Sequence, residues 1–131
     1  MASKTEDIGR RFAAAAEARD AKALAALYSP DASFWNNVLR GTSTTEQVLE
    51  LTKMEAAHIP DYRFDDVRCT ASENGFVLQM TVTGTTDAGT SFAVAGCLVA
   101  QVDGDRITRI DEYVDATQAR PIFEAILGRP A

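Results

Sequence analysis

The sequence predicts an α+β fold in which helices cover one face of a curved antiparallel sheet. In the first half of the chain, apolar residues recur at helical spacing, whereas from Tyr62 to Asp115 they alternate every second residue, as in strands. The second half also contains Asn74-Gly75, Ala88-Gly89 and Asp103-Gly104, which are short turn signals of hairpin type. Consecutive hairpins make an antiparallel meander, and helices must cover one of its faces.

The first part of the chain is expected to be mostly helical. A cap at Asp20 separates two helices, Ser29-Pro30-Asp31 signals a turn, and Pro60 stops the third helix. The expected elements are a helix over Thr5–Arg19, a second helix over Ala21–Tyr28, a short strand over Ala32–Asn37, and a third helix that begins after a cap at Thr44 or Thr45 and runs to about His58.

Four successive strands and a closing helix are expected in the rest of the chain. The strands are predicted over Tyr62–Ser72, Phe76–Thr86, Ser91–Val102 and Arg106–Asp115. The helix is predicted over Thr117–Leu127, with Pro121 limiting its first turn, and Gly128 and Pro130 end it. The Ser91–Val102 strand is apolar on both faces and therefore needs two covering layers. Because helices supply only one layer, we expect a homodimer that packs sheet against sheet.

Length and composition exclude several classes of protein. The 131 residues suit one domain over residues 1–131, and 46% hydrophobic and 24% charged residues are ordinary for a globular protein. The net charge of −6 argues against nucleic acid or an anionic membrane as a partner, because both need a basic patch. No apolar run of about 18 residues and no signal-peptide pattern is present, so a cytoplasmic location is expected.

Glu112 is the most informative residue for function. It shares one face of its predicted strand with Thr108, Ile110 and Val114, so a carboxylate lies on a nearly apolar face. An unpaired carboxylate in such a setting costs several kcal/mol or becomes protonated. One interpretation is a functional carboxylate with a raised pKa, which suits acid–base work near neutral pH. The other is a structural carboxylate that a neighbour or a water pairs.

Cysteine and histidine usage predicts neither a metal nor another cofactor. Cys69 and Cys97 are not in a CxxC pair, and His58 is the only histidine, so a structural zinc site would lack ligands. We expect both cysteines to be buried thiols that act as small apolar residues, rather than to have a metal or redox role.

Three stretches resemble the nuclear transport factor 2-like superfamily, which includes SnoaL-like cyclases, ketosteroid isomerases and limonene epoxide hydrolases. They are residues 17–34 (EARDAKALAALYSPDASF), residues 59–64 (IPDYRF) and residues 103–115 (DGDRITRIDEYVD). The resemblance implies a cone-shaped fold with a deep pocket between the concave sheet face and the helices. It is a poor guide to chemistry, because one fold hosts many functions.

The resemblance allows the functional positions of three family mechanisms to be compared with the residues at the matching positions of this chain. The positions that hold the enolate oxygen in ketosteroid isomerases match Phe12 and about Leu98, which cannot donate a hydrogen bond, and the base position matches Asn36. Limonene epoxide hydrolases match at Asn36 and Glu112, but Phe34 replaces a Tyr. Their Arg and second Asp fall near Thr81 and Thr83. The acidic residue of SnoaL-like cyclases matches Glu112, although the His of their Gly-Thr-His stretch is Thr86 here.

The function expected from this sequence is proton transfer on a small, mostly apolar metabolite without a cofactor. Glu112 would move the proton and Asn36 would orient the substrate or water. Candidate substrate-binding residues are Phe12, Phe34, Trp35, His58, Thr81 and Leu98. Isomerisation, cyclisation, dehydration and water addition fit one carboxylate. A cavity of roughly 300 Å³ or more is expected beside Glu112. The alternatives are a module that binds a hydrophobic ligand without chemistry and a structural dimerisation domain.

Overall fold

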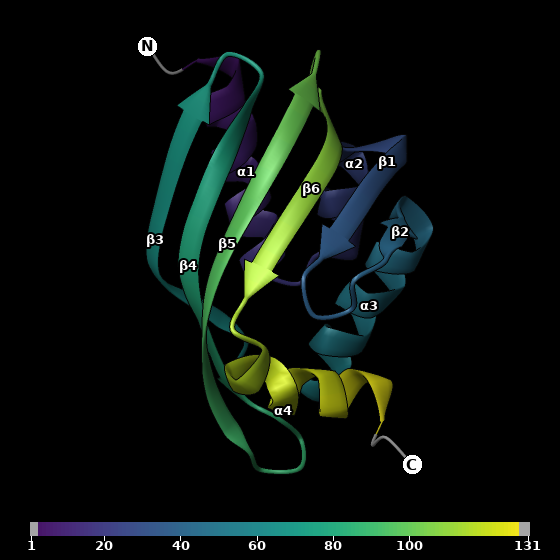
Figure 1. The fold of residues 1–131 in the computed structure, drawn as a ribbon, viewed down its shortest axis with the longest axis vertical. Coiled ribbons are helices and arrows are strands. Elements are labelled where there is room, and N and C mark those ends of the chain that lie inside the picture. Colours follow the sequence, from purple (N-terminus) through teal and green to yellow (C-terminus); the bar gives the residue numbers. More distant parts are fainter. Residues whose placement is uncertain (1–2, 129–131) are drawn as a thin grey trace.

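The computed structural model describes residues 3–128, in which helices pack against one six-stranded sheet (Figure 1). The helices are α1 (Lys4–Glu17), α2 (Ala21–Leu27), α3 (Thr45–His58) and α4 (Ala116–Leu127). The strands are β1 (Tyr28–Asn36), β2 (Thr42–Thr44), β3 (Arg63–Ser72), β4 (Gly75–Thr85), β5 (Ser91–Asp103) and β6 (Arg106–Val114). Among the described residues, no helix is long and apolar enough to cross a membrane.

The sheet order is β2-β1-β6-β5-β4-β3, so the predicted meander of four strands is confirmed. All neighbouring strands are antiparallel except β1 and β6, which run parallel. The helices α1, α2 and α3 lie on one side of the curved sheet, and α4 crosses one of its ends (Figure 1). This arrangement is the α+β fold with a curved sheet around the N-terminal helices that the sequence predicts.

Capping side chains determine where the helices begin. Asp20 accepts a hydrogen bond from the backbone N–H of Ala23, as predicted. Thr44, rather than Thr45, caps α3, and Gln47 bonds back to it in a reciprocal capping box.

The beginning of β1 differs from the prediction. Ser29-Pro30-Asp31 lies within the strand instead of forming a separate turn. Pro30 is tolerated because β2 pairs with β1 only from Ser33 onward, and the pairing with β6 is irregular between Tyr28 and Ser33. The short strand β2 was not predicted, because three residues are too few to show the alternation of apolar and polar side chains that indicates a strand.

A bulge in β6 changes which of its side chains face the helices. Val102 pairs with Ile107 but Gln101 pairs with Arg109, so one extra residue lies in β6. Ile107 and Ile110 are therefore both buried, whereas strict alternation placed them on opposite faces. The predicted alternation holds from Ile110 onward and directs Glu112 toward the helices.

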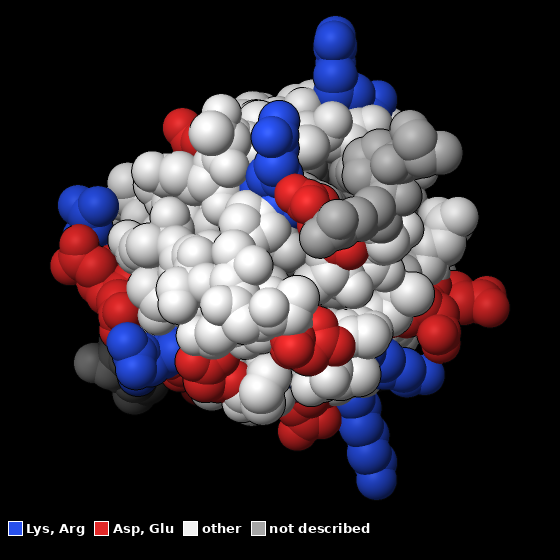
Figure 2. Space-filling model, turned by 90° about the horizontal axis from the view of Figure 1, so that it is seen from below, with Lys and Arg blue, Asp and Glu red and all other residues white. Residues whose placement is uncertain are grey.

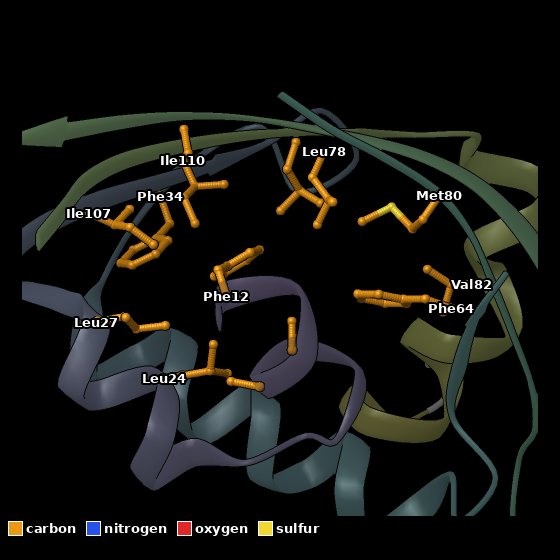
Figure 3. Packing of buried hydrophobic residues seen from close by; sticks show 14 of the residues in the cluster. Phe12, Leu24, Leu27, Phe34, Phe64, Leu78, Met80, Val82, Ile107 and Ile110 are labelled. Carbon is orange, nitrogen blue, oxygen red and sulfur yellow. The ribbon is translucent and has the colours of Figure 1, made fainter. Parts of the chain in front are cut away.

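The core lies between the concave face of the sheet and the helices. Figure 3 shows Leu78, Ile107 and Ile110 pointing from the sheet toward Phe12 of α1, with Leu24 and Leu27 of α2 below. On β5, Val94 and Leu98 are buried in this core, while the alternating Val99 is 38% exposed on the outer face.

Gly75 at the start of β4 provides a stability test. A Cβ at this position would lie 2.0 Å from the carbonyl oxygen of Ala100, so Gly75→Ala forces β4 and β5 apart. We expect a loss of about 1–3 kcal/mol or more in the free energy of unfolding, measured by urea denaturation. Gly41→Ala is the control, because its nearest contact is 3.9 Å away. Equal stability of the two variants would contradict this packing argument.

Candidate active site

A cavity of about 160 Å³ lies between the concave face of the sheet and the helices. Side chains from α1, α2, α3, α4 and the inner face of the sheet line it, and most of them are apolar. The end of the molecule at which α4 lies has large areas without charged side chains (Figure 2). The cavity is about half the expected size, and the buried rings of Phe12, Phe34 and Phe64 are among its walls.

Glu112 and Asn36 lie side by side in the wall of this cavity. They are partners in the parallel pairing of β1 and β6, and the Asn36 Nδ2 donates to the Glu112 Oε1 at 2.7 Å. The Asn36 Oδ1 accepts from the backbone N–H groups of Val38 and Leu39 at 2.8 and 3.2 Å. Since the amide oxygen is held by backbone donors, the NH₂ group must face Glu112. Asn36 therefore both ends its strand and orients the carboxylate.

The surroundings of Glu112 favour its protonated form. Burial raises the pKa of Glu112, and the nearby Glu55 raises it further. The hydrogen bond from Asn36 and the charge of Arg19 act in the opposite direction without cancelling the rise. A carboxyl group whose pKa is moved toward neutrality is suited to take up and return a proton.

A second polar cluster, which the sequence did not predict, lines the same cavity. Arg19 donates to Glu55 in an ion pair, and the two side chains are only 11% and 17% exposed. The Arg19 guanidinium also lies over the ring of Tyr62, 4.2 Å from the ring centroid. Burial raises the pKa of Glu55, although Arg19 opposes that rise.

Arg19 occupies an unusual backbone position. The Arg19 N–H donates to Ala16 O, and the next N–H, of Asp20, donates to Ala15 O, which is the Schellman arrangement at the end of α1. This position requires left-handed backbone and is usually glycine, yet Arg19 adopts it with φ of 52°. The only feature of the sequence that could have pointed to this site is that an arginine, rather than the usual glycine, lies directly before the Asp20 cap.

Two tyrosines complete the polar part of the cavity. Tyr28 and Tyr62 both line it, and their hydroxyl groups make no hydrogen bond among the described residues. Burial raises the pKa of both phenols far above neutrality, so both remain hydrogen-bond donors. No fully enclosed polar side-chain atom of the described residues lacks a partner, so both hydroxyl groups keep some solvent-accessible surface.

The predicted site residues fall into two groups. The cavity lining includes Glu112 and Asn36 and the predicted substrate-binding residues Phe12, Phe34, Trp35 and Leu98. The Trp35 ring itself lies toward the outer face of the sheet, because Trp35 alternates with the buried Phe34, and it packs against Tyr113 with 5.3 Å between ring centroids.

His58 and Thr81 do not belong to the lining. His58 ends α3 and its Nδ1 bonds Asp87 at 2.6 Å. Thr81 alternates along β4 with the buried residues Met80 and Val82, so it faces away from the core. Within residues 3–128, no group of His, Cys, Asp and Glu side chains could hold a metal ion.

Solved structures show the same fold. A hypothetical protein from Catenulispora acidiphila with a ketosteroid isomerase-like fold, in complex with trimethylamine, is 21% identical over 96% of this chain and 95% of its own, with a TM-score of 0.76. IdmH from Streptomyces antibioticus, described as a putative polyketide cyclase, is 16% identical over 92% and 99%, with a TM-score of 0.78. A putative polyketide cyclase from Pseudomonas putida is 18% identical over 90% and 96%, with a TM-score of 0.76.

No curated protein matches the chain. Residues 9–110 match the SnoaL-like domain, which is most of the chain. On that match the chain belongs to the SnoaL-like domain family, and its fold is that of ketosteroid isomerase-like and nuclear transport factor 2-like structures.

Proposed function

We propose that this protein is a cofactor-free enzyme that moves a proton on a small, mostly apolar metabolite, with Glu112 as the acid–base group. The observation that carries the proposal is the Glu112 carboxyl group, held by Asn36 at 2.7 Å in the wall of an apolar cavity. The other carboxyl oxygen makes no hydrogen bond to a described residue, so it is free to meet a ligand. The two similar structures that are described as putative polyketide cyclases support this class of chemistry.

The proposal fits the chemistry of the lining. An apolar wall binds the carbon skeleton of the metabolite, and the buried carboxylate takes a proton from an acidic C–H bond. Returning that proton to another carbon gives an isomer, and attack by the carbanion within the same molecule gives a ring. Asn36 keeps the carboxylate in one orientation throughout, because its amide is held on both sides.

Uptake of deuterium from solvent tests the proposal before the substrate is known. The protein is incubated in D₂O with small 1,3-dicarbonyl and aryl ketone compounds, and mass spectrometry follows replacement of their acidic C–H hydrogens. We expect the wild-type protein to accelerate exchange in at least one compound, and Glu112→Gln to lose the acceleration. A compound that binds but exchanges equally fast with both proteins would overturn the catalytic role of Glu112.

A non-catalytic role in binding a hydrophobic ligand is the second candidate. The predominance of apolar side chains in the lining favours it. It predicts that apolar compounds of benzene size raise the thermal midpoint while none of the panel exchanges faster than in buffer. Thermal stabilisation without accelerated exchange would favour ligand binding over catalysis as the function of this protein.

We also propose that the protein is a homodimer in which the outer faces of two sheets meet. Val99 and Tyr113 are 38% and 47% exposed on neighbouring strands, and Trp35 packs beside Tyr113. Asp111, which is paired with Arg109, lies between Trp35 and Val99 on this face, so its charge is already neutralised beside the exposed apolar side chains.

Light scattering after gel filtration tests the dimer. We expect a dimer mass for the wild type and a monomer mass for Val99→Lys, because the lysine charge would be buried in the proposed interface. Leu127→Lys is the control, since Leu127 is 52% exposed and lies on α4 rather than on the sheet. A monomeric wild-type protein would contradict the proposal.

A further inference from the structure

We propose that Asn37 is a positioning residue for the proposed reaction, and that its side-chain amide fixes the end of β6 so that the Glu112 carboxyl group stays beside Asn36 and shielded from water. The inference rests on the proposed function, because it concerns the residue that moves the proton. It goes further by assigning a task to Asn37, which does not line the cavity and whose side-chain hydrogen bonds go to another residue, Val114.

The pairing of β1 with β6 ends at the candidate site. Asn36 and Glu112 are the last pair in register, and the Asn37 N–H still donates to the Glu112 carbonyl oxygen at 3.1 Å. In a regular parallel pair, the next bond would run from the Val114 N–H to the carbonyl oxygen of Asn37. The chain turns away here instead, and the Arg40 N–H donates to the carbonyl oxygen of Asn36 at 2.8 Å. The strand β6 therefore continues to Val114, beyond its last partner in β1.

The side chain of Asn37 replaces the missing backbone of β1. Its Oδ1 accepts from the Val114 N–H at 2.9 Å, and its Nδ2 donates to the Val114 carbonyl oxygen at 3.0 Å. One amide thus satisfies both backbone groups of Val114, as a neighbouring strand would. The task needs a carboxamide, because an aspartate of the same size lacks the donor and a leucine lacks both donor and acceptor.

These hydrogen bonds lie next to Glu112 in the wall of the cavity. Glu112 and Val114 are two residues apart on β6, so their side chains point to the same face, and both line the cavity. On the β5 side they pair with Leu98 and Gly96. On the β1 side, the strand is held by the N–H and the side chain of Asn37. Without that side chain, the N–H and C=O groups of Val114 need water as a partner, and this water would enter the wall beside Glu112.

Shielding from water matters because burial is the main cause of the raised pKa of Glu112. The other titratable and polar groups that act on or near its carboxyl group are Arg19, Tyr28, Asn36, Glu55 and Tyr62. None of them is hydrogen-bonded to Asn37 in the described part of the chain, so replacing Asn37 leaves them in place. Water admitted at Val114 would therefore act on the burial of Glu112 and lower its pKa toward the ordinary value.

Asn37→Ala should impair the reaction without impairing binding. A misplacement of about 1 Å caused by a distant mutation can slow a reaction by roughly 10²-fold. We expect the kcat for deuterium exchange to fall by about 10–100-fold, and KM to change little because Asn37 does not line the cavity. The rise of the exchange rate with pH should also move to lower pH, because it follows the pKa of Glu112.

Carbon-13 NMR of the glutamate carboxyl carbons follows the protonation of Glu112 without any substrate. The signal that is missing from the spectrum of Glu112→Gln identifies the residue. We expect the midpoint of its titration to lie at lower pH in Asn37→Ala than in the wild type. A purely structural role of Asn37 would lower the stability and leave this midpoint unchanged. Asn37→Ser removes the amide but keeps a hydroxyl group, and it repeats the test if the alanine variant does not fold.

Thr5→Val is the matched control for the loss of a side chain that holds a strand end. The Thr5 Oγ1 donates to the carbonyl oxygen of Ser72, the last residue of β3, at 2.5 Å, and neither residue lines the cavity of Glu112. We expect Thr5→Val to lower the urea midpoint, because the hydrogen bond is lost, and to keep the wild-type titration of Glu112 and the wild-type exchange rate. If Asn37→Ala behaves in the same way as Thr5→Val, the positioning role is overturned.

The NMR titration separates this inference from the proposed function. A lower midpoint in Asn37→Ala, with no exchange by the wild type for any compound of the panel, would support the positioning of Glu112 by Asn37 and overturn the proton-transfer function. Exchange that Glu112→Gln loses but Asn37→Ala retains, with an unchanged midpoint, would overturn the role of Asn37 alone.

Discussion

Replacing Glu112 by Gln is expected to slow deuterium exchange by about 10²–10⁴-fold and, at neutral pH, to make the protein more stable. The rate falls because an amide cannot accept the proton. Stability rises because the folded protein no longer keeps a carboxylate in an apolar wall beside Glu55. Asn36 can still donate to the amide oxygen of the introduced glutamine, so the orienting hydrogen bond is retained. Loss of activity together with a gain in stability is the signature of a carboxylate kept for function.

The gain in stability of Glu112→Gln over the wild type should increase as the pH rises. The folded-state pKa of Glu112 is raised by burial and by Glu55, against the opposing effects of Asn36 and Arg19. Tyr28 and Tyr62 also lie near Glu112 but stay neutral, because burial raises the pKa of both phenols.

Below the ordinary glutamate pKa of about 4.3, Glu112 is protonated in both the folded and unfolded states, so the two proteins should be equally stable. As the pH rises from there through the raised pKa, the wild type loses about 1.4 kcal/mol for each unit of the shift, and the Gln variant does not. Urea denaturation at a series of pH values measures this difference, and exchange by the wild type should increase over the same interval.

Glu17→Gln is the matched control. The Glu17 carboxylate accepts a hydrogen bond from the backbone N–H of Phe64 at 2.9 Å and does not line the cavity. We expect this variant to lose stability or stay unchanged, and to exchange at the wild-type rate. If Glu112→Gln is instead the less stable protein at neutral pH, Glu112 is a structural residue and the proposed function loses its main support.

Much of the fold is predictable because its signals are local. Alternation along β3 to β6, the glycine turns between them and the Asp20 cap each involve residues that are neighbours in sequence. The bulge at Ile107 and the early start of β1 are different. They depend on how β6 pairs with β5 and β1 at the same time, which no single segment encodes.

The candidate site likewise contains one part that the sequence predicts and one part that it does not. Glu112 and Asn36 are visible as polar side chains on inward faces of two predicted strands, and the sheet register then brings them together. The pair of Arg19 and Glu55 lies 36 residues apart in sequence and joins a turn to a helix. Its contact depends on how the α1–α2 turn lies against α3, so charge patterns along either segment could not reveal it. Sequence reasoning finds site residues on strands more readily than those on turns.

Phe12→Ala is expected to lower the free energy of unfolding by about 3–5 kcal/mol, the usual range for deleting a buried phenylalanine. Phe12 is 3% exposed and forms the floor of the cavity. Its ring lies 5.7 Å from that of Phe76 and 6.4 Å from that of Tyr28. Removing it takes away these contacts and leaves a larger cavity that the rigid sheet cannot close. Urea denaturation measures the loss, and Phe12→Leu, with a smaller loss, keeps the test usable if the alanine variant does not fold.

Benzene distinguishes a lost cavity wall from general damage at Phe12. Because the enlarged cavity is apolar, benzene should raise the thermal midpoint of Phe12→Ala or Phe12→Leu more than that of the wild type. Phe123→Ala is the control, since Phe123 also lines the cavity but is only partly buried on α4, so its loss should be smaller. Equal losses for Phe12→Ala and Phe123→Ala, with no extra benzene effect, would mean that Phe12 is not the residue that limits the cavity.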